Sequence, residues 1–270
     1  MIGSQVRLTW YLEKREVDSI TVPAAGSGQV NAEYAWGGAT GRGVRVCVMD
    51  SGVEAGHPLV GAVVSSSGLD ENLDVVEVPP EDVHGHGTAC AGIVRRIAPE
   101  CEIHSLRILD HRGITSGRAL IAALRWAVTQ GFDVINLSLS TSKEEFRGPL
   151  QEALDLAYFN RVLVVASAHN MRIESFPWRF SSSISVGSHR ESDPETFLYN
   201  PEPPVEFFAP GQAVTVAAPG GGTTRNTGNS FATPHITGRC ALILSKHPEL
   251  TPFQVKNVLY LTAANVVTGR

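Results

Sequence analysis

The stretch NTGNSFATPHITG, residues 226–238, places one serine between a glycine-rich turn and an apolar run with helical character. Gly228 permits the turn, and the pattern predicts a helix that begins at Ser230 and has Pro234 in its first turn, where a missing N–H costs nothing. The start of a helix carries backbone N–H groups without helical partners. A hydroxyl there suits a nucleophile, because the negative charge of a tetrahedral intermediate forms beside those donors. Taken alone, Ser230 is better explained as a simple helix N-cap.

The composition is that of a globular protein. The chain has 270 residues, of which 43% are hydrophobic and 18% are charged, and this length suits one α/β domain with additions. The 27 acidic residues outnumber the 22 basic ones, with a net charge of −5 and no basic block. This balance excludes nucleic acid as a favoured partner. No apolar run reaches the roughly 18 residues of a membrane span, so we expect no membrane association.

The N-terminus and the cysteines predict a cytoplasmic protein. Charged residues at positions 13–16 interrupt any apolar run, so no signal peptide is recognised. The four cysteines are far apart and form no CxxC pair, which predicts buried thiols. The small-residue linker AAGSGQ, residues 24–29, separates an N-terminal extension, residues 1–30, from a single domain over residues 31–270.

Strand and helix patterns alternate along the domain. Apolar runs predict buried parallel strands at 44–50, 102–109, 132–139, 161–168 and 183–188. Helical spacing predicts helices over 116–131, with Ser116 as the cap, and over 147–160. The alternation predicts a doubly wound, mostly parallel α/β sheet with helices on both faces and a site beyond the carboxyl ends of its strands. The segment 65–82 is predicted to be an acidic surface loop.

Two further residues have the chemistry of a catalytic site. Asp50 ends the strand VRVCVMD, although an aspartate there is often only a turn former. His86 in HGHGTACAGIV stands at the start of a helix of small residues, although a lone loop histidine is more often a surface residue. His84 and His86 have HxH spacing, but no third ligand follows at a suitable spacing, so no metal site is predicted.

In the order Asp50, His86, Ser230, these motifs resemble those of the subtilisin-like serine proteases. The resemblance covers about residues 31–270 and rests on VRVCVMDSGV, GHGTACAG, VVASAHN and GNSFATPHITG. It implies a subtilisin-like fold and a serine endopeptidase that acts on a peptide or protein without a cofactor. Ser230 is then the nucleophile, His86 the base, Asp50 its orienting partner, and Asn170 an oxyanion donor. His86 must be neutral to accept a proton, so we expect kcat/KM to rise through a pKa near neutrality.

The resemblance also implies which residues contact the substrate: Ser138, Leu139, Ser140, Ala168 and His169. Family members tend to have glycine at the positions of Ser140 and His169, so the added side chains predict a preference for a small or polar residue before the cleaved bond. The short connection after the histidine helix lacks the family's calcium loop. Together with the missing signal peptide, this favours a selective processing protease acting on a precursor peptide or protein.

Three alternatives stay open. One is a catalytically silent, peptide-binding relative, and another is a ligase or macrocyclase that transfers the acyl group to an amine. The third is a nucleotide-binding α/β protein, which needs a glycine-rich phosphate loop after the first strand. The segment DSGVEAG has neither the GxGxxG nor the GK(S/T) pattern of such a loop, which argues against a nucleotide-binding protein. The sequence makes no prediction of oligomeric state.

Overall fold

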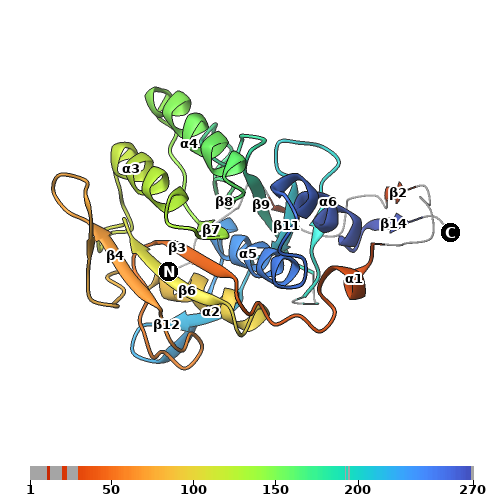
Figure 1. Cartoon of the computed structure of the whole chain (residues 1–270), viewed down its shortest axis with the longest axis horizontal. Helices are drawn as coiled ribbons and strands as arrows, with labels where there is room; N and C mark the ends of the chain where they lie inside the picture. Colours follow the sequence, from red (N-terminus) through yellow and green to blue (C-terminus); the bar gives the residue numbers. More distant parts are fainter. Residues whose placement is uncertain (1–10, 13–19, 23–29, 192, 194, 269–270) are drawn as a thin grey trace, which may run out of the picture.

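A mostly parallel sheet forms the centre of the protein, for which we describe a computed structural model (Figure 1). The structure describes residues 11–12, 20–22, 30–191, 193 and 195–268. In order across the sheet, the strands are β10 (Leu198–Tyr199), β11 (Phe207–Pro210), β9 (Ile184–His189), β8 (Leu163–Ser167), β7 (Val134–Leu137), β3 (Arg45–Asp50), β6 (Glu102–Arg107), β4 (Ser65–Leu69) and β5 (Val75–Glu77). Neighbours run parallel except in the pairs β10–β11 and β4–β5. The five predicted strands and the doubly wound fold class are thereby confirmed.

The prediction of a surface loop over residues 65–82 is wrong, because β4 and β5 form there. Strand β4 pairs with β6 in parallel register, with Ser66 opposite Ser105. Its sequence, SSSGL, has the composition of a loop, and pairing with the neighbouring strand overrides that local preference. The Ser66 side chain is buried and donates its hydroxyl to the carbonyl of Pro79 at 3.2 Å, so its polar group is satisfied.

Helices cover both faces of the sheet (Figure 1). Helices α2 (His86–Ile97) and α5 (Asn229–Lys246) pack on one face, and α3 (Gly117–Val128) and α4 (Arg147–Phe159) pack on the other. Strand β3 shows the reason, because Val46 and Val48 enter the first core cluster while Cys47 and Met49 enter the second. The two predicted helices are α3 and α4, and Ser116 caps α3 by accepting the N–H of Ala119 at 3.1 Å.

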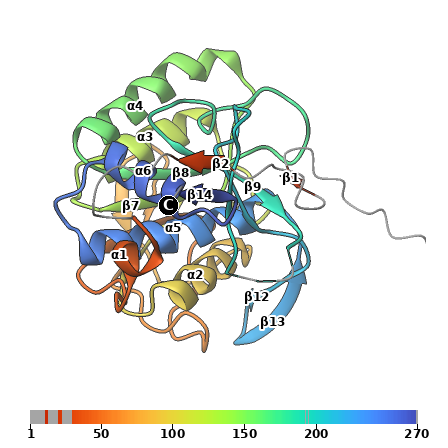
Figure 2. The same cartoon turned by 90° about the vertical axis from the view of Figure 1, so that its right-hand side faces the viewer.

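Smaller elements surround this frame. They are the helices α1 (Ala32–Trp36) and α6 (Pro252–Thr262), the short 3-10 helix η1 (Glu144–Phe146), and two additional strand pairs. The hairpin of β12 (Val214–Ala218) and β13 (Gly222–Asn226) stands apart from the main sheet on the side of α2 (Figure 2). The four cysteines are free and buried, as predicted. None of the described helices is long and apolar enough to cross a membrane.

Parts of the N-terminal segment contribute to the structure. Strand β1 (Tyr11–Leu12) pairs in parallel with β9, and β2 (Ile20–Val22) pairs in parallel with β14 (Val266–Thr268). The predicted linker at 24–29 and most of residues 1–30 lie outside the described residues. The division into an extension, residues 1–30, and a domain, residues 31–270, therefore stays a prediction.

Helix α4 offers a matched pair of leucines that tests the core. Leu154 is fully buried between α4 and the sheet, whereas Leu156 on the same helix is 42% exposed. We expect Leu154→Ala to lower the free energy of unfolding by about 2–5 kcal/mol, because it removes buried methyl groups and leaves a cavity. Leu156→Ala should change it by less than about 0.5 kcal/mol. Urea unfolding of both variants measures the difference, and equal losses would contradict this packing.

Candidate active site

A buried carboxylate and an imidazole face each other at the carboxyl end of β3. Asp50 is fully buried, and both of its carboxylate oxygens lie 2.9 Å from Nδ1 of His86. Oδ1 also accepts the backbone N–H of Ser51 at 2.8 Å. A carboxylate only accepts hydrogen bonds, so the neutral His86 ring carries its proton on Nδ1. The other ring nitrogen, Nε2, is then free to accept a proton.

Close packing of glycines brings α2 to this position. Helix α2 begins at His86, directly after Gly85, whose φ of 97° favours glycine. A Cβ on Gly87 would lie 2.1 Å from the carbonyl oxygen of Gly52, so only glycine allows the helix to approach the end of β3 this closely. The sequence GHG around His86 is therefore a packing requirement as well as a motif.

Asp82 holds the start of α2 and was missed by the sequence analysis. Its carboxylate accepts the backbone N–H groups of His84, Gly85 and Thr88 at 2.7–3.0 Å, together with the hydroxyls of Thr88 and Ser51 at 2.7 Å. Burial opposes its ionisation, but the hydrogen bonds from Thr88, Gly85 and His84 outweigh it and lower the pKa of Asp82. Gly85 has no side chain to accept the free N–H groups at the start of α2. A glycine at this position with an acidic residue just upstream is therefore the sequence signal that could have identified Asp82.

Burial and the neighbouring Asp50 carboxylate act in opposite directions on the pKa of His86. Burial by itself disfavours the charged imidazolium, but the Asp50 carboxylate overcomes this and raises the pKa of His86 well above its ordinary value. We therefore expect the pKa that governs kcat/KM to lie above the near-neutral value expected from the sequence. Cys90 lies one helical turn further along α2, with Sγ 3.9 Å from Nδ1 of His86. Burial raises the pKa of Cys90, which keeps it a neutral thiol.

Asp50, His86 and Cys90 are all potential metal ligands, and their ligand atoms lie within 4.8 Å of one another. A metal ion there would need a thiolate, which the raised pKa of Cys90 opposes, and would compete with the hydrogen bonds between Asp50 and His86. The arrangement therefore fits a hydrogen-bonded pair better than a metal centre. The absence of a metal site stays a prediction.

Ser230 lies in the first turn of α5. The helix begins at Asn229, one residue earlier than predicted, and Pro234 stands in its second turn, so the prediction of a first-turn proline is wrong. Because proline has no N–H, the carbonyl of Ser230 lacks its usual partner four residues on. It accepts the Ser138 hydroxyl at 2.9 Å instead. Among the described residues, the Ser230 hydroxyl itself makes no hydrogen bond.

A buried chain of hydrogen bonds that includes Asn136 of β7 supports the contact between Ser138 and the carbonyl of Ser230. Thr237 on α5 donates its hydroxyl to Oδ1 of Asn136 at 2.9 Å, and Asn136 donates from Nδ2 to the Ser138 hydroxyl at 3.0 Å. Ser138, predicted from the resemblance to contact substrate, is thus buried, and its hydroxyl holds the main chain of Ser230 at the start of α5. Thr237 and Asn136 were not singled out in the sequence, because the chain connects two elements about a hundred residues apart.

The other predicted substrate residues lie at the ends of β7 and β8. Leu139 is partly buried against the α3 and α4 core, and Ser140 is partly exposed. Ala168 is buried, and the ring of His169 turns toward the following residues, where Nδ1 accepts the N–H of Met171 at 2.9 Å. Their contact with substrate stays a prediction.

Asn170 follows β8 and is exposed. Its Oδ1 accepts the backbone N–H of Asn229 at 2.9 Å, which ties it to the residue before Ser230. The Phe231 ring lies 5.1 Å from the His86 ring between centroids, and Sγ of Cys90 lies 3.6 Å from the carbonyl oxygen of Ser230. The structure thus brings together side chains from four separate segments, at the edge where parallel strands of the sheet end.

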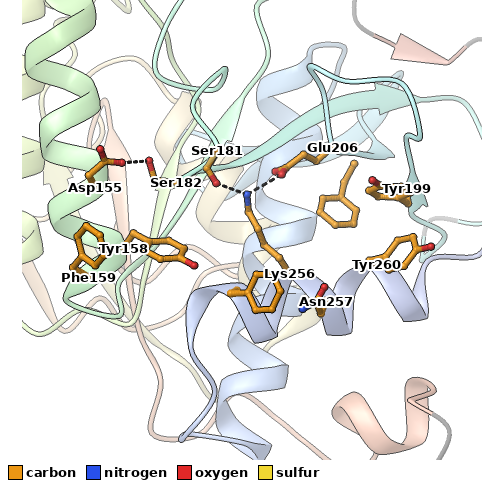
Figure 3. A pocket seen from close by; sticks show the side chains of 12 residues that line it. Asp155, Tyr158, Phe159, Ser181, Ser182, Tyr199, Glu206, Lys256, Asn257 and Tyr260 are labelled. Atoms are coloured by element: carbon orange, nitrogen blue, oxygen red, sulfur yellow. Dashed lines mark hydrogen bonds and ion pairs between the residues drawn. The ribbon is translucent and has the colours of Figure 1, made fainter. Parts of the chain in front are cut away.

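Two cavities differ in their chemistry. A cavity of about 280 Å³ lies beside His86 and Phe231 and is also lined by Ala217 and Thr224. A cavity of about 670 Å³ lies between α4 and α6, near the amino ends of β9 and β11 (Figure 3). There the Lys256 ammonium pairs with Glu206 at 2.8 Å and donates to the carbonyl of Ser181 at 2.7 Å. The first cavity is lined by His86, whose ring is held from behind by the buried Asp50 carboxylate, so the candidate chemistry lies there despite its smaller volume.

The chain is similar to known proteins over most of its length. The model of the subtilase family matches residues 41–270. Subtilisin DY of Bacillus licheniformis is 32% identical over 85% of this chain and 86% of its own length. Subtilisin E of Bacillus subtilis is 30% identical over 84% of this chain, and the match spans 62% of its length. The crystal structure of a lanthipeptide protease has a TM-score of 0.67 and 25% identity, covering 80% of this chain and 78% of that one.

The raised pKa of His86 predicts the pH dependence of activity. The imidazole must be neutral to take a proton, so kcat/KM should increase with pH and reach half of its maximum above the ordinary histidine pKa of about 6.5. Hydrolysis of a chromogenic peptide from pH 5 to 10 measures this. His111→Gln, which changes an exposed histidine, serves as a control and should leave the midpoint in place. A midpoint at or below 6.5 would contradict the effect of Asp50.

The role of Asp82 predicts a loss of stability. Asp82→Asn removes a charged acceptor, and we expect it to lower the free energy of unfolding at pH 7 by about 1–3 kcal/mol. Because the folded-state pKa of Asp82 is lowered, its contribution is fully present above the unfolded pKa of about 3.9 and is lost as the pH falls through the lower folded value. Urea unfolding at pH 7 and at lower pH measures the effect. Glu71→Gln, at an exposed carboxylate, should change little, and equal losses for the two variants would refute the role of Asp82.

Proposed function

The chain belongs to the subtilase family of serine endopeptidases, and we propose that it cleaves a specific precursor peptide or protein through an acyl-enzyme on Ser230. The observation that carries the catalytic assignment is the hydrogen-bonded pair of Asp50 and His86 beside the start of α5. In this proposal Ser230 is the nucleophile, His86 the general base, and Asp50 the group that orients the imidazole.

The hydrogen bonds support a definite order of proton transfers. Asp50 holds the proton of His86 on Nδ1, so Nε2 takes the hydroxyl proton as Oγ of Ser230 attacks the peptide carbonyl carbon. The imidazolium that forms is stabilised by the buried carboxylate. It then gives the proton to the leaving amine, and the peptide bond breaks to leave an ester on Ser230. Water then attacks the ester carbonyl carbon while His86 takes one of its protons; the ester bond breaks, the acid product leaves, and His86 returns the proton to Oγ of Ser230.

The oxyanion has two donors in this proposal. The backbone N–H of Ser230, in the first turn of α5, has no helical partner. The second donor is Nδ2 of Asn170, because its Oδ1 is already engaged by Asn229. Such donors stabilise the charge that develops in the transition state, and removing one costs roughly 10² to 10³ in kcat in a subtilisin.

Selectivity for a precursor is the finer part of the proposal. It is supported by the similarity to the solved structure of a lanthipeptide protease. Further support comes from the side chains of Ser140 and His169, at positions where family members tend to have glycine. We propose that these two side chains line the pocket for the residue before the cleaved bond, where their bulk and polarity favour small or polar residues.

A peptide library tests both parts. We expect the wild-type protein to cleave a restricted set of peptides, mainly after small or polar residues, as identified by mass spectrometry. Ser230→Ala should lower kcat by several orders of magnitude, because it removes the attacking oxygen. Labelling of the wild type, and not of the variant, by a fluorophosphonate would separate an active enzyme from a silent relative. Efficient cleavage after Phe or Leu would contradict the proposed pocket.

A further inference from the structure

Asn229, the residue directly before Ser230, connects three segments of the protein. Its side chain is fully buried at the start of α5. Oδ1 accepts the backbone N–H of Ser188, in β9, at 3.0 Å. Nδ2 donates to the carbonyl oxygens of Ala168 and His169, after β8, at 3.2 Å each. Both donors and the acceptor of this amide are therefore engaged, and none is directed to solvent.

The backbone of Asn229 also decides the orientation of the Asn170 carboxamide. A backbone N–H can only donate, so the atom of Asn170 that it meets at 2.9 Å is the carbonyl oxygen. The NH₂ group of Asn170 then lies on the other side of the carboxamide, and among the described residues it makes no hydrogen bond. Asn229 thus contacts Asn170 directly and also holds the two residues that precede it.

We propose that Asn229 is a positioning residue for the oxyanion site. Its side chain fixes the main chain of residues 168–169, and thereby Asn170, relative to the helix start that carries Ser230. The inference rests on the proposed roles of Ser230 and Asn170. Donors act on an oxyanion only within about 2.7–3.1 Å, and a shift of about 1 Å costs on the order of 10²-fold in rate. A rigid link between the donor and the nucleophile therefore has a catalytic effect without contact to the substrate.

The proposal explains why an amide suits this position. Two carbonyl oxygens and one N–H converge on the side chain, and asparagine supplies two donors and one acceptor. Asn229→Asp keeps the shape but places carboxylate oxygen beside two carbonyl oxygens. Asn229→Ser is neutral but is one group too short to reach both carbonyls.

Asn265 offers a matched control. It is also fully buried, and its amide bridges the N–H and carbonyl of Tyr199 at 2.8 Å each, on β10 at the far edge of the sheet. Substitution at either asparagine removes a similar set of buried hydrogen bonds. Only substitution at Asn229 should affect the oxyanion site.

The experiment compares kinetics with the binding of a transition-state mimic. We expect Asn229→Ser and Asn229→Asp to lower kcat by about 10-fold to 100-fold, with KM changed by less than about threefold. The affinity for a peptide aldehyde, which forms a tetrahedral adduct on Ser230, should fall in parallel with kcat/KM. Asn265→Asp should lower Tm but change kcat and aldehyde affinity by less than about twofold. Circular dichroism identifies the folded variants.

A double variant separates positioning from general stability. If Asn229 acts through Asn170, then Asn229→Ser should cause little further loss of kcat in the Asn170→Ala protein. Losses that multiply in the double variant, or Asn229 variants that lower Tm and leave kcat unchanged, would overturn the proposal. A wild-type protein whose activity does not depend on Ser230 would instead overturn the proposed function, and Ser230→Ala reveals that outcome separately.

Discussion

The fully buried carboxylate of Asp50 is the constraint on which the active-site region depends. A charge removed from water is costly unless hydrogen bonds compensate it, and here they come from the His86 ring and the N–H of Ser51. The end of β3 and the start of α2 must therefore stay in contact. Gly87 allows this contact, because no side chain fits against the carbonyl of Gly52. The same carboxylate raises the pKa of His86. The contact between β3 and α2 and the proton affinity of the imidazole therefore both depend on Asp50.

The start of α5 is held from two sides by buried polar groups. On one side, Pro234 leaves the carbonyl of Ser230 without a helical donor, and the Ser138 hydroxyl from the β7 side supplies one. On the other side, Asn229 joins the ends of β8 and β9. Each group is satisfied only when helix and strands are correctly docked. The first turn of α5, with Ser230, is thus aligned by hydrogen bonds that exist only when the helix is docked on the folded sheet.

The two cavities illustrate that volume does not identify a catalytic site. The cavity of about 670 Å³ between α4 and α6 is larger, yet its lysine, Lys256, is held in an ion pair with Glu206. The cavity of about 280 Å³ beside His86 contains the polarised imidazole. Reactivity depends on how charges and donors are arranged, and in a doubly wound sheet that arrangement lies where the strands end.

The sequence alone determined the fold class, the strands and helices with strong hydrophobic periodicity, and the family. These follow from local patterns, because apolar spacing and short motifs such as GHGTACAG and GNSFATPHITG are readable without coordinates. Other features were decided only by the tertiary structure. The polar segment SSSGL became a strand because β6 lay beside it, and Asp82, Asn136, Thr237 and Asn229 gained their roles from partners in other segments. A hydrogen bond between distant segments depends on position after folding, and a residue's identity does not reveal its partner.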